Sequence, residues 1–157
     1  MIKCSRAKSL LDDVNRSIKE IKSFKSVSIE EESYLAKFLV VYICGVYEEA
    51  IECIVNERIG TLNSTMMERF FVWYIDNRFR NPDISKVNGL LGQFNELWKT
   101  KINALPLSTR TAFNNFLSNK NKIAHGKPCS VTLREVLDDY KRSKRVITTI
   151  DRIVKFV

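Results

Sequence analysis

The residue types best suited to chemistry gather in one short stretch, Asn119 to Gly126. His125 is the only histidine in a chain of 157 residues, and a glycine follows it directly. An imidazole titrates near neutral pH, so His125 could act as a general acid or base. Lys120 and Lys122 precede it, and each ammonium can hold a phosphate as a point charge. Together these side chains would suit proton transfer on an anionic substrate.

The stretch lies within a long run that has no carboxylate. Between Leu97 and Arg134 there is no Asp or Glu, and the run carries seven basic residues: Lys99, Lys101, Arg110, Lys120, Lys122, Lys127 and Arg134. The formal net charge of the whole chain is +8. A positive surface attracts polyanions, so nucleic acid is the first candidate partner and a membrane surface the second. The acids gather elsewhere, since seven of them lie between Glu30 and Gly60 against two bases.

A structural role for His125 competes with the chemical one. The pattern predicts a helix from about Thr109 to Ala124 that is ended by Gly126 and Pro128. A histidine in the last turn of a helix is favoured simply because its cation meets the negative end of the helix dipole. The residue types alone leave both roles open.

Other chemistries lack the residues that they need. One histidine without a nearby carboxylate gives too few ligands for a metal ion, so we expect no metal and no cofactor. The four cysteines lie far apart without a Cys-x-x-Cys spacing, which is typical of reduced thiols. The most apolar window, Phe38 to Tyr47, is about half of the ~20 residues that span a bilayer. We therefore expect a soluble, cytoplasmic protein.

The heptad from Lys120 to Gly126, Lys-Asn-Lys-Ile-Ala-His-Gly, resembles the Arg-Asn-x-Ile-Ala-His-Gly signature of the HEPN superfamily. Within that superfamily, the chain resembles the branch called RiboL-PSP or MAE-type HEPN. The similarity also includes the apolar helix leading into Tyr47-Glu48, the segment Asn81 to Phe94 and the start of the last helix at Val131, and it covers about residues 33–157. The resemblance implies an all-helical bundle, usually a homodimer. It also implies the activity of many members, which are metal-independent endoribonucleases of toxin–antitoxin and phage-defence systems.

The resemblance implies a role for each matching residue of the heptad. His125 would accept the proton of the ribose 2′-OH or protonate the leaving 5′ oxygen. Lys120, at the family's arginine position, would hold the scissile phosphate, and Asn121, one turn before His125, would orient the site. Lys122 and Lys127 are weaker candidates for RNA contacts. Such cleavage needs RNA, because DNA lacks the 2′-OH, and it leaves a 2′,3′-cyclic phosphate.

In the family two such motifs face each other across a dimer and form one cleft. A single histidine per chain is too few for separate acid and base roles, which independently favours a homodimer. Glu48 matches an acidic position in the family's long helix and is a weak candidate for an acid in the cleft. An antitoxin protein is a further candidate partner, and no membrane partner is expected.

Lys120 is a departure from the family pattern. Lysine keeps the charge of arginine, but it lacks the planar guanidinium that forms two parallel hydrogen bonds with a phosphate. A second hypothesis is therefore a catalytically degenerate module that binds RNA or a protein partner, and whether the chain is an enzyme stays open. A third hypothesis is a structural interaction bundle whose basic half binds an acidic protein.

The remaining sequence predicts an all-α, single-domain bundle of five or six helices over residues 1–157, in which 1–27 form an N-terminal helical segment. Five Gly and three Pro are too few for a β-sandwich or barrel. Apolar residues at helical spacing predict helices at about Ser5–Phe24, Ser28–Ile59, Met66–Phe79, Ile84–Ile102, Thr109–Ala124 and Thr132–Phe156. The expected capping pairs are Ser28 with Glu31, Thr65 with Glu68 and Thr132 with Glu135, and Ser108 is expected to cap the fifth helix.

Three of these helices carry further expectations. The second is apolar nearly all round between Phe38 and Tyr47, so it should be the central buried helix, with a close helix contact at Gly45 and a left-handed end at Gly60. The third is unusually aromatic, and its rings are interpreted as core in preference to a platform for stacking bases. Gly89 and Gly92 are candidate interruptions of the fourth helix.

Overall fold

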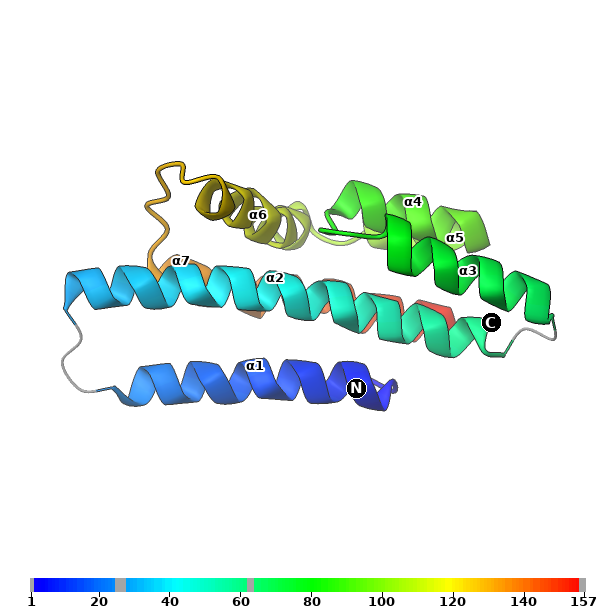
Figure 1. The fold of residues 1–157 in the computed structure, drawn as a ribbon, viewed down its shortest axis with the longest axis horizontal. Helices are drawn as coiled ribbons and strands as arrows, with labels where there is room; N and C mark the ends of the chain where they lie inside the picture. Colours follow the sequence, from blue (N-terminus) through cyan, green and yellow to red (C-terminus); the bar gives the residue numbers. More distant parts are fainter. Residues whose placement is uncertain (1, 25–27, 62–63, 156–157) are drawn as a thin grey trace.

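The computed structural model describes residues 2–24, 28–61 and 64–155, and these form seven helices (Figure 1). The helices are α1 (Ser5–Ser23), α2 (Ile29–Ile59), α3 (Thr65–Arg78), α4 (Ile84–Phe94), α5 (Glu96–Asn103), α6 (Leu107–Ala124) and α7 (Leu133–Lys155). No strand occurs in these ranges. The all-α prediction is confirmed, with one helix more than the expected five or six. The expected end of the last helix at Phe156, and residues 25–27 of the N-terminal segment, lie outside the described residues.

The additional helix arises at Asn95, which divides the predicted Ile84–Ile102 helix into α4 and α5. Asn95 has an extended backbone (φ −163°, ψ 121°), and its side-chain oxygen accepts a hydrogen bond from the Leu97 N–H at 2.9 Å. An asparagine oxygen satisfies a free N–H at a helix start, so Asn95 is the N-cap of α5. Gly89 and Gly92 lie inside α4 and do not interrupt it.

Helix α2 is the centre of the bundle, as predicted. It contacts α1, α3, α6 and α7, and α7 also contacts α5 and α6. In Figure 1, α1 and α2 run side by side, α7 lies behind α2, and α3 to α5 gather at the end of the molecule where α2 finishes. The core consists of apolar side chains from these helices, and several are fully inaccessible, among them Leu39, Ile43, Ile51, Ile54, Ile147 and Ile150.

Tyr47 anchors the middle of α2 in this core. Its ring stacks on Phe113 of α6, with centroids 5.2 Å apart, and meets Phe116 edge-on. Its hydroxyl is hydrogen-bonded to Ser143 Oγ of α7 at 2.6 Å, and burial raises the pKa of Tyr47 well above its ordinary value. Tyr47 therefore joins α2 to α6 and α7 and fixes the rotation of α2 at the next residue, Glu48.

The apolar middle of α2 is not buried all round, which corrects the prediction. Tyr34, Phe38 and Val41 are 72%, 55% and 42% exposed, so one stripe of the helix faces outward. Gly45 continues this stripe, and a Cβ built there would meet no atom within 4 Å. The expected close helix contact at Gly45 is therefore not made with the described part of this chain, because the neighbouring helices pack on the other faces of α2.

The aromatic rings of α3 divide between two environments. Phe71 stacks on Phe94 of α4 with centroids 4.7 Å apart, and Phe79 at the end of α3 is buried. Phe70 and Trp73 are 57% and 53% exposed, so the predicted core role is wrong for these two rings. The reason is that α3 packs chiefly on α2 and α4 and leaves one face open.

The helix ends follow local sequence signals with small displacements. The capping boxes of Ser28 with Glu31 and Thr132 with Glu135 are both formed. Helix α3 is capped by Ser64, one residue before the predicted Thr65. Helix α6 begins directly after Pro106, so Ser108 lies in its first turn and is not its cap. Gly60 has φ −61°, so α2 ends without the predicted left-handed residue.

Candidate active site

The end of α6 is closed by backbone hydrogen bonds. The Lys127 N–H donates to the Lys122 carbonyl at 2.8 Å, and the Gly126 N–H donates to the Ile123 carbonyl at 3.2 Å. These two bonds form a Schellman motif, which requires a left-handed residue, and Gly126 supplies it with φ 62°. The prediction that Gly126 ends this helix is confirmed.

His125 lies at the C-cap, between the helix and this loop. Its backbone N–H donates to the Asn121 carbonyl at 3.1 Å. Its side chain is exposed, and the imidazole makes no hydrogen bond with the residues that the structure describes. Since the backbone already satisfies the helix end, the ring is not needed as a hydrogen-bonding cap. It is open to solvent and to a ligand.

The side chains of Asn121 and Lys120 project from different sides of α6. Asn121 is exposed and lies one turn before His125, so these two predicted site residues share a face of the helix. Lys120 is five residues before His125, about 140° round the helix, and is half-buried. The structure therefore places Lys120 toward the body of the bundle, on another side of α6 from the imidazole.

The Lys120 ammonium is held by the connection between α3 and α4. It donates a hydrogen bond to Asn81 Oδ1, and the backbone N–H of Asn81 donates to Glu48 Oε2. Asn81 has φ 50°, a left-handed conformation that asparagine adopts more readily than most residues. Lys120 and the candidate cleft acid Glu48 are thus brought together by a residue that the sequence did not assign to the site.

Two further cations complete this cluster, which we call the Lys120 network. Arg80 Nη1 lies 3.3 Å from Glu48 Oε1 and 3.3 Å from Glu52 Oε1. The Lys86 ammonium donates to the backbone carbonyls of Arg80 at 2.6 Å and of Asn81 at 3.3 Å. The network therefore combines an arginine and two lysines with two carboxylates.

Arg80 is a further candidate residue of this region, and the sequence analysis did not identify it. It lies 40 positions before Lys120, and the only signal near it was the break at Asn81-Pro82. That break predicts a connection but does not say which helices the connection meets. Burial raises the pKa of the Cys44 thiol beside the network, where Lys120 and Glu48 act on it in opposite directions.

The two weaker candidates for RNA contacts have different surroundings. Lys122 lines a hollow of about 470 Å³ that also includes three carboxylates, Glu135, Asp138 and Asp139 of α7. Carboxylates compete with phosphate for an ammonium, so Lys122 is less suited to an RNA backbone than the sequence suggested. Lys127 is exposed in the loop that follows His125.

The chain offers acid–base and electrostatic groups at this site. Within residues 2–24, 28–61 and 64–155, no three His, Cys, Asp or Glu side chains are grouped to hold a metal ion.

None of the helices in these ranges combines the length and the apolar character that crossing a bilayer requires.

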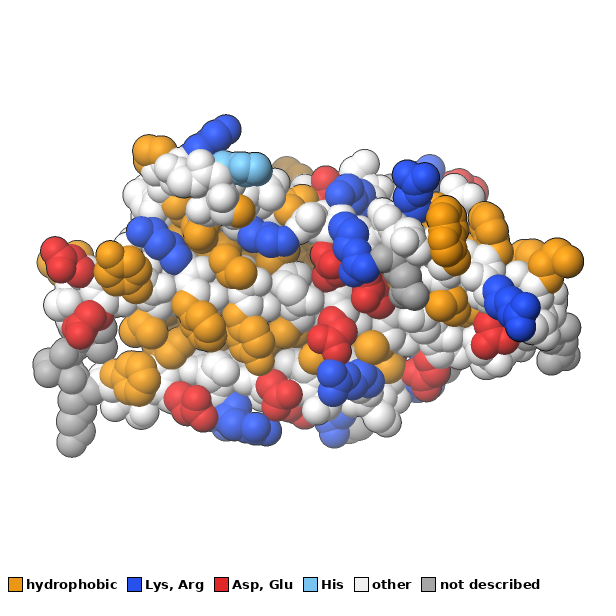
Figure 2. Space-filling model, viewed as in Figure 1, with side chains coloured by type: hydrophobic (Ala, Val, Ile, Leu, Met, Phe, Trp, Pro, Cys, Tyr) orange, Lys and Arg blue, Asp and Glu red, His pale blue; other side chains and the backbone are white. Residues whose placement is uncertain are grey.

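An exposed apolar stripe of α2 adjoins the Lys120 network. Tyr34, Phe38, Val41 and Gly45 follow one another at helical spacing, and Glu48 is the next position along the same line. Figure 2 shows hydrophobic side chains gathered over α2, on the same face of the molecule as the one histidine, drawn in pale blue. The candidate site thus lies beside an apolar surface that the described chain does not cover.

Comparison with known proteins identifies a family for almost the whole chain. The family model described as RiboL-PSP-HEPN matches residues 5–155. The match starts at the first residue of α1 and ends at the last residue of α7, so it extends further toward the N-terminus than the motif resemblance, which began near Ser33. Neither the curated proteins nor the solved structures give a match.

Proposed function

Because the chain belongs to the RiboL-PSP-HEPN family, we propose that it is a metal-independent endoribonuclease whose active centre includes His125, Asn121 and Lys120. The observation that carries the proposal is the unengaged imidazole of His125 at a helix end that the backbone already satisfies. Lys120 supports it as well, because it supplies a cation on the same helix as His125, and an ammonium can hold a phosphate.

In this proposal the ribose 2′-oxygen attacks the adjacent phosphorus while the bond from phosphorus to the 5′-oxygen breaks. One imidazole takes the proton of the 2′-OH, and a protonated imidazole gives a proton to the 5′-oxygen, so the reaction has no net change in protons. The products are a 2′,3′-cyclic phosphate and a 5′-hydroxyl end. Lys120 stabilises the added negative charge on the phosphate, and Asn121 orients the site.

We infer that the two imidazoles come from two copies of the chain, since each copy has one histidine. The stripe of Tyr34, Phe38 and Val41 supports this inference, because a contiguous exposed apolar patch typically marks an interface. In a two-fold dimer the same stripe from each copy would meet, and both candidate sites would lie beside the shared surface.

The family extends the proposal to a biological role. The enzyme would act in the cytoplasm as a toxin or phage-defence effector, with RNA as its substrate and an antitoxin protein as a partner. Neither a metal nor another cofactor takes part in the chemistry proposed.

A second candidate function is binding of RNA or a protein partner without cleavage. The observation that favours it is the Lys120 ammonium, which is already engaged by Asn81. A lysine that stays there would hold a phosphate loosely, and it lacks the paired donors of the family's arginine. Charge stabilisation in the transition state would then be too weak for cleavage.

Incubation of the purified protein with total RNA in EDTA tests both candidates. The wild type should cut RNA and leave 2′,3′-cyclic phosphate ends, and His125→Ala should reduce cleavage by at least a hundredfold, the size of a general acid–base contribution. Lys120→Arg should increase cleavage. Lys101→Arg is a matched control, because Lys101 is exposed on α5 within the same positive run, and it should leave the rate unchanged.

The outcomes separate the candidates. Cleavage by Lys120→Arg alone would favour the degenerate module over the active ribonuclease. Equal cleavage by wild type and His125→Ala would reject the proposed chemistry. If no variant cuts or binds RNA, the interaction bundle is the better account.

A further inference from the structure

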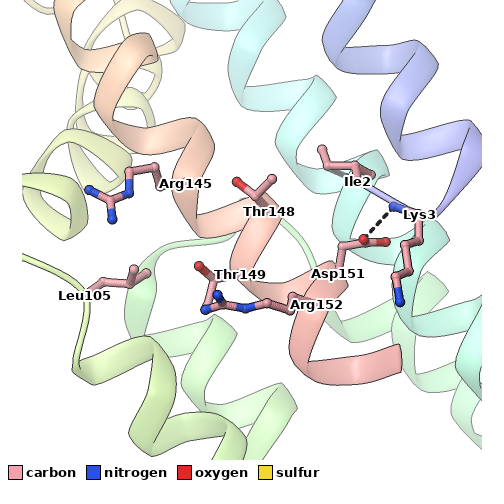
Figure 3. Close-up of a pocket in the computed structure, with 8 residues that line it drawn as sticks. All are labelled: Ile2, Lys3, Leu105, Arg145, Thr148, Thr149, Asp151 and Arg152. Carbon is pink, nitrogen blue, oxygen red and sulfur yellow. Dashed lines mark hydrogen bonds between the residues drawn. The ribbon is translucent and has the colours of Figure 1, made fainter. Parts of the chain in front are cut away.

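A second concave site lies between α7, the connection from α5 to α6 and the N-terminal segment (Figure 3). Its volume is about 710 Å³, within the range of pockets that take small molecules, roughly 300–1,000 Å³. The site is remote from His125: Arg145, which lines it, lies twelve residues beyond the start of α7, about 18 Å along the helix axis. The two sites are therefore separate.

Three basic residues line this cavity, Arg145 and Arg152 of α7 and Lys3 of the N-terminal segment. Arg145 and Arg152 are seven residues apart on α7, so they project from the same side of the helix. Neither guanidinium forms an ion pair or a hydrogen bond within the described ranges of the chain. Figure 3 shows both groups extending from α7 toward the side of the cavity where Leu105 lies.

The carboxylate in the lining, Asp151, does not neutralise these arginines. Asp151 is fully buried, and its two oxygens accept hydrogen bonds from the backbone N–H groups of Lys3 at 2.7 Å and Cys4 at 2.9 Å. In Figure 3 it points toward the N-terminal segment, away from the two guanidinium groups. Asp151 therefore fixes a wall of the cavity and leaves the charge of the arginines uncompensated.

Hydroxyl and apolar groups complete the lining. The Thr149 hydroxyl makes no hydrogen bond inside the described part of the structure, and Figure 3 shows it on the same side of α7 as the two arginines. Leu105 and Ile2 provide apolar surface. Guanidinium groups and a hydroxyl donor suit an anion with several oxygens, and a phosphate monoester carries enough charge to balance two arginines.

We propose that this cavity binds a small phosphate monoester, with Arg145 and Arg152 on the phosphate, Thr149 donating to it, and the rest of the molecule against Leu105 and Ile2. The volume of about 710 Å³ suits a small ester. Sugar phosphates and mononucleotides share this chemistry. Binding would join α7 to the N-terminal segment and to the connection before α6, and it would not depend on the proposed RNA cleavage.

Isothermal titration calorimetry on the full chain tests the proposal with ribose 5-phosphate, adenosine 5′-monophosphate and adenosine. Both phosphate esters should bind, and adenosine should not. Arg145→Gln and Arg152→Gln should each weaken the binding of the ester at least tenfold. Arg134→Gln is the matched control, since it removes the same charge from an exposed position of α7 outside the cavity, and it should change the affinity less than twofold.

The relative affinities of the two esters identify the source of the phosphate. Tighter binding of the mononucleotide indicates that a base lies against Leu105 and Ile2, and equal affinities indicate a sugar phosphate. Binding should persist in His125→Ala, which keeps this result independent of the ribonuclease. The proposal is overturned if adenosine binds as well as its phosphate ester, if Arg134→Gln loses as much affinity as Arg152→Gln, or if neither ester binds.

Discussion

Lys120 and Glu48 are joined through one residue, Asn81, although 72 positions separate them in the chain. Asn81 accepts a hydrogen bond from the lysine with its side chain and donates one to the glutamate with its backbone. Its backbone is left-handed, with φ 50°. The position of the candidate phosphate-binding cation therefore depends on the conformation of the connection between α3 and α4.

This arrangement predicts different costs for two adjacent glutamates. Glu48→Ala removes the acceptor of the half-buried Asn81 N–H and a partner of Arg80, so we expect the free energy of unfolding to fall by about 1–3 kcal/mol. Glu49→Ala breaks only an exposed pair with Arg6 and should cost less than about 1 kcal/mol. Urea unfolding followed by circular dichroism measures both. Equal losses of unfolding free energy would mean that the Lys120 network stabilises the fold no more than an exposed ion pair does.

The backbone at the end of α6 can be tested with two glycines. A Cβ built at Gly126 or at Gly89 would meet no atom within 4 Å, so neither substitution to alanine causes a clash. Gly126 has φ 62°, and Gly126→Ala should destabilise by about 1–2 kcal/mol because of the left-handed strain. Gly89 lies inside α4, and Gly89→Ala should stabilise by about 0.5–1 kcal/mol. Thermal unfolding of the two variants should therefore shift in opposite directions, and a Gly126→Ala variant that melts no earlier than the wild type would contradict the Schellman motif.

Features that depend on neighbouring residues were predictable from the sequence. The capping box at Ser28 and the end of α6 at Gly126 each rest on hydrogen bonds between residues a few positions apart. The split at Asn95 is also local, because it depends on an asparagine side chain that caps the next helix, whereas Gly89 and Gly92, the candidate interruptions, lie inside α4.

Features that depend on the packing of distant segments were not predictable. Helical spacing cannot choose an outward face when a segment is apolar nearly all round, which is why the pattern predicts a buried Phe38 although its side chain is 55% exposed. The meeting of Lys120 with Asn81 depends on how the connection before α4 folds against α6. The heptad identified His125 and Asn121 as neighbours, because one turn of helix separates them.

The two capping carboxylates predict sensitivity to acid. Hydrogen bonds from Ser28 lower the pKa of Glu31, and hydrogen bonds from Thr132 lower the pKa of Glu135, relative to the ordinary value of 4.5. A group whose pKa is lower in the folded state stabilises the fold above its unfolded pKa, and the contribution is lost as the pH falls through the folded value. We expect the melting temperature to fall as the pH drops below about 4.5.

Removing these two carboxylates should make the melting temperature less sensitive to acid. The double variant Glu31→Gln and Glu135→Gln should have a lower melting temperature than the wild type at pH 7. Its melting temperature should also fall less than that of the wild type when the pH is lowered, as measured by thermal scans across the pH range. Glu20→Gln, on the exposed face of α1, is the control and should follow the wild-type profile. If the melting temperature of the double variant fell with pH as steeply as that of the wild type, other titratable groups would be responsible for the loss of stability in acid.

The apolar stripe of α2 predicts that dimerisation and cleavage are lost together. Val41 is 42% exposed, so Val41→Glu places a charge on the stripe without burying it inside the chain. At micromolar concentration we expect a dimer for the wild type and a monomer for Val41→Glu by light scattering, with RNA cleavage lost in the variant and its helical circular dichroism retained. Leu97→Glu adds the same charge at a 67% exposed position of α5 and should leave both mass and cleavage unchanged. A dimer that persists in Val41→Glu would exclude this stripe as the interface, and a wild-type monomer that cuts RNA would overturn the cleft with two histidines.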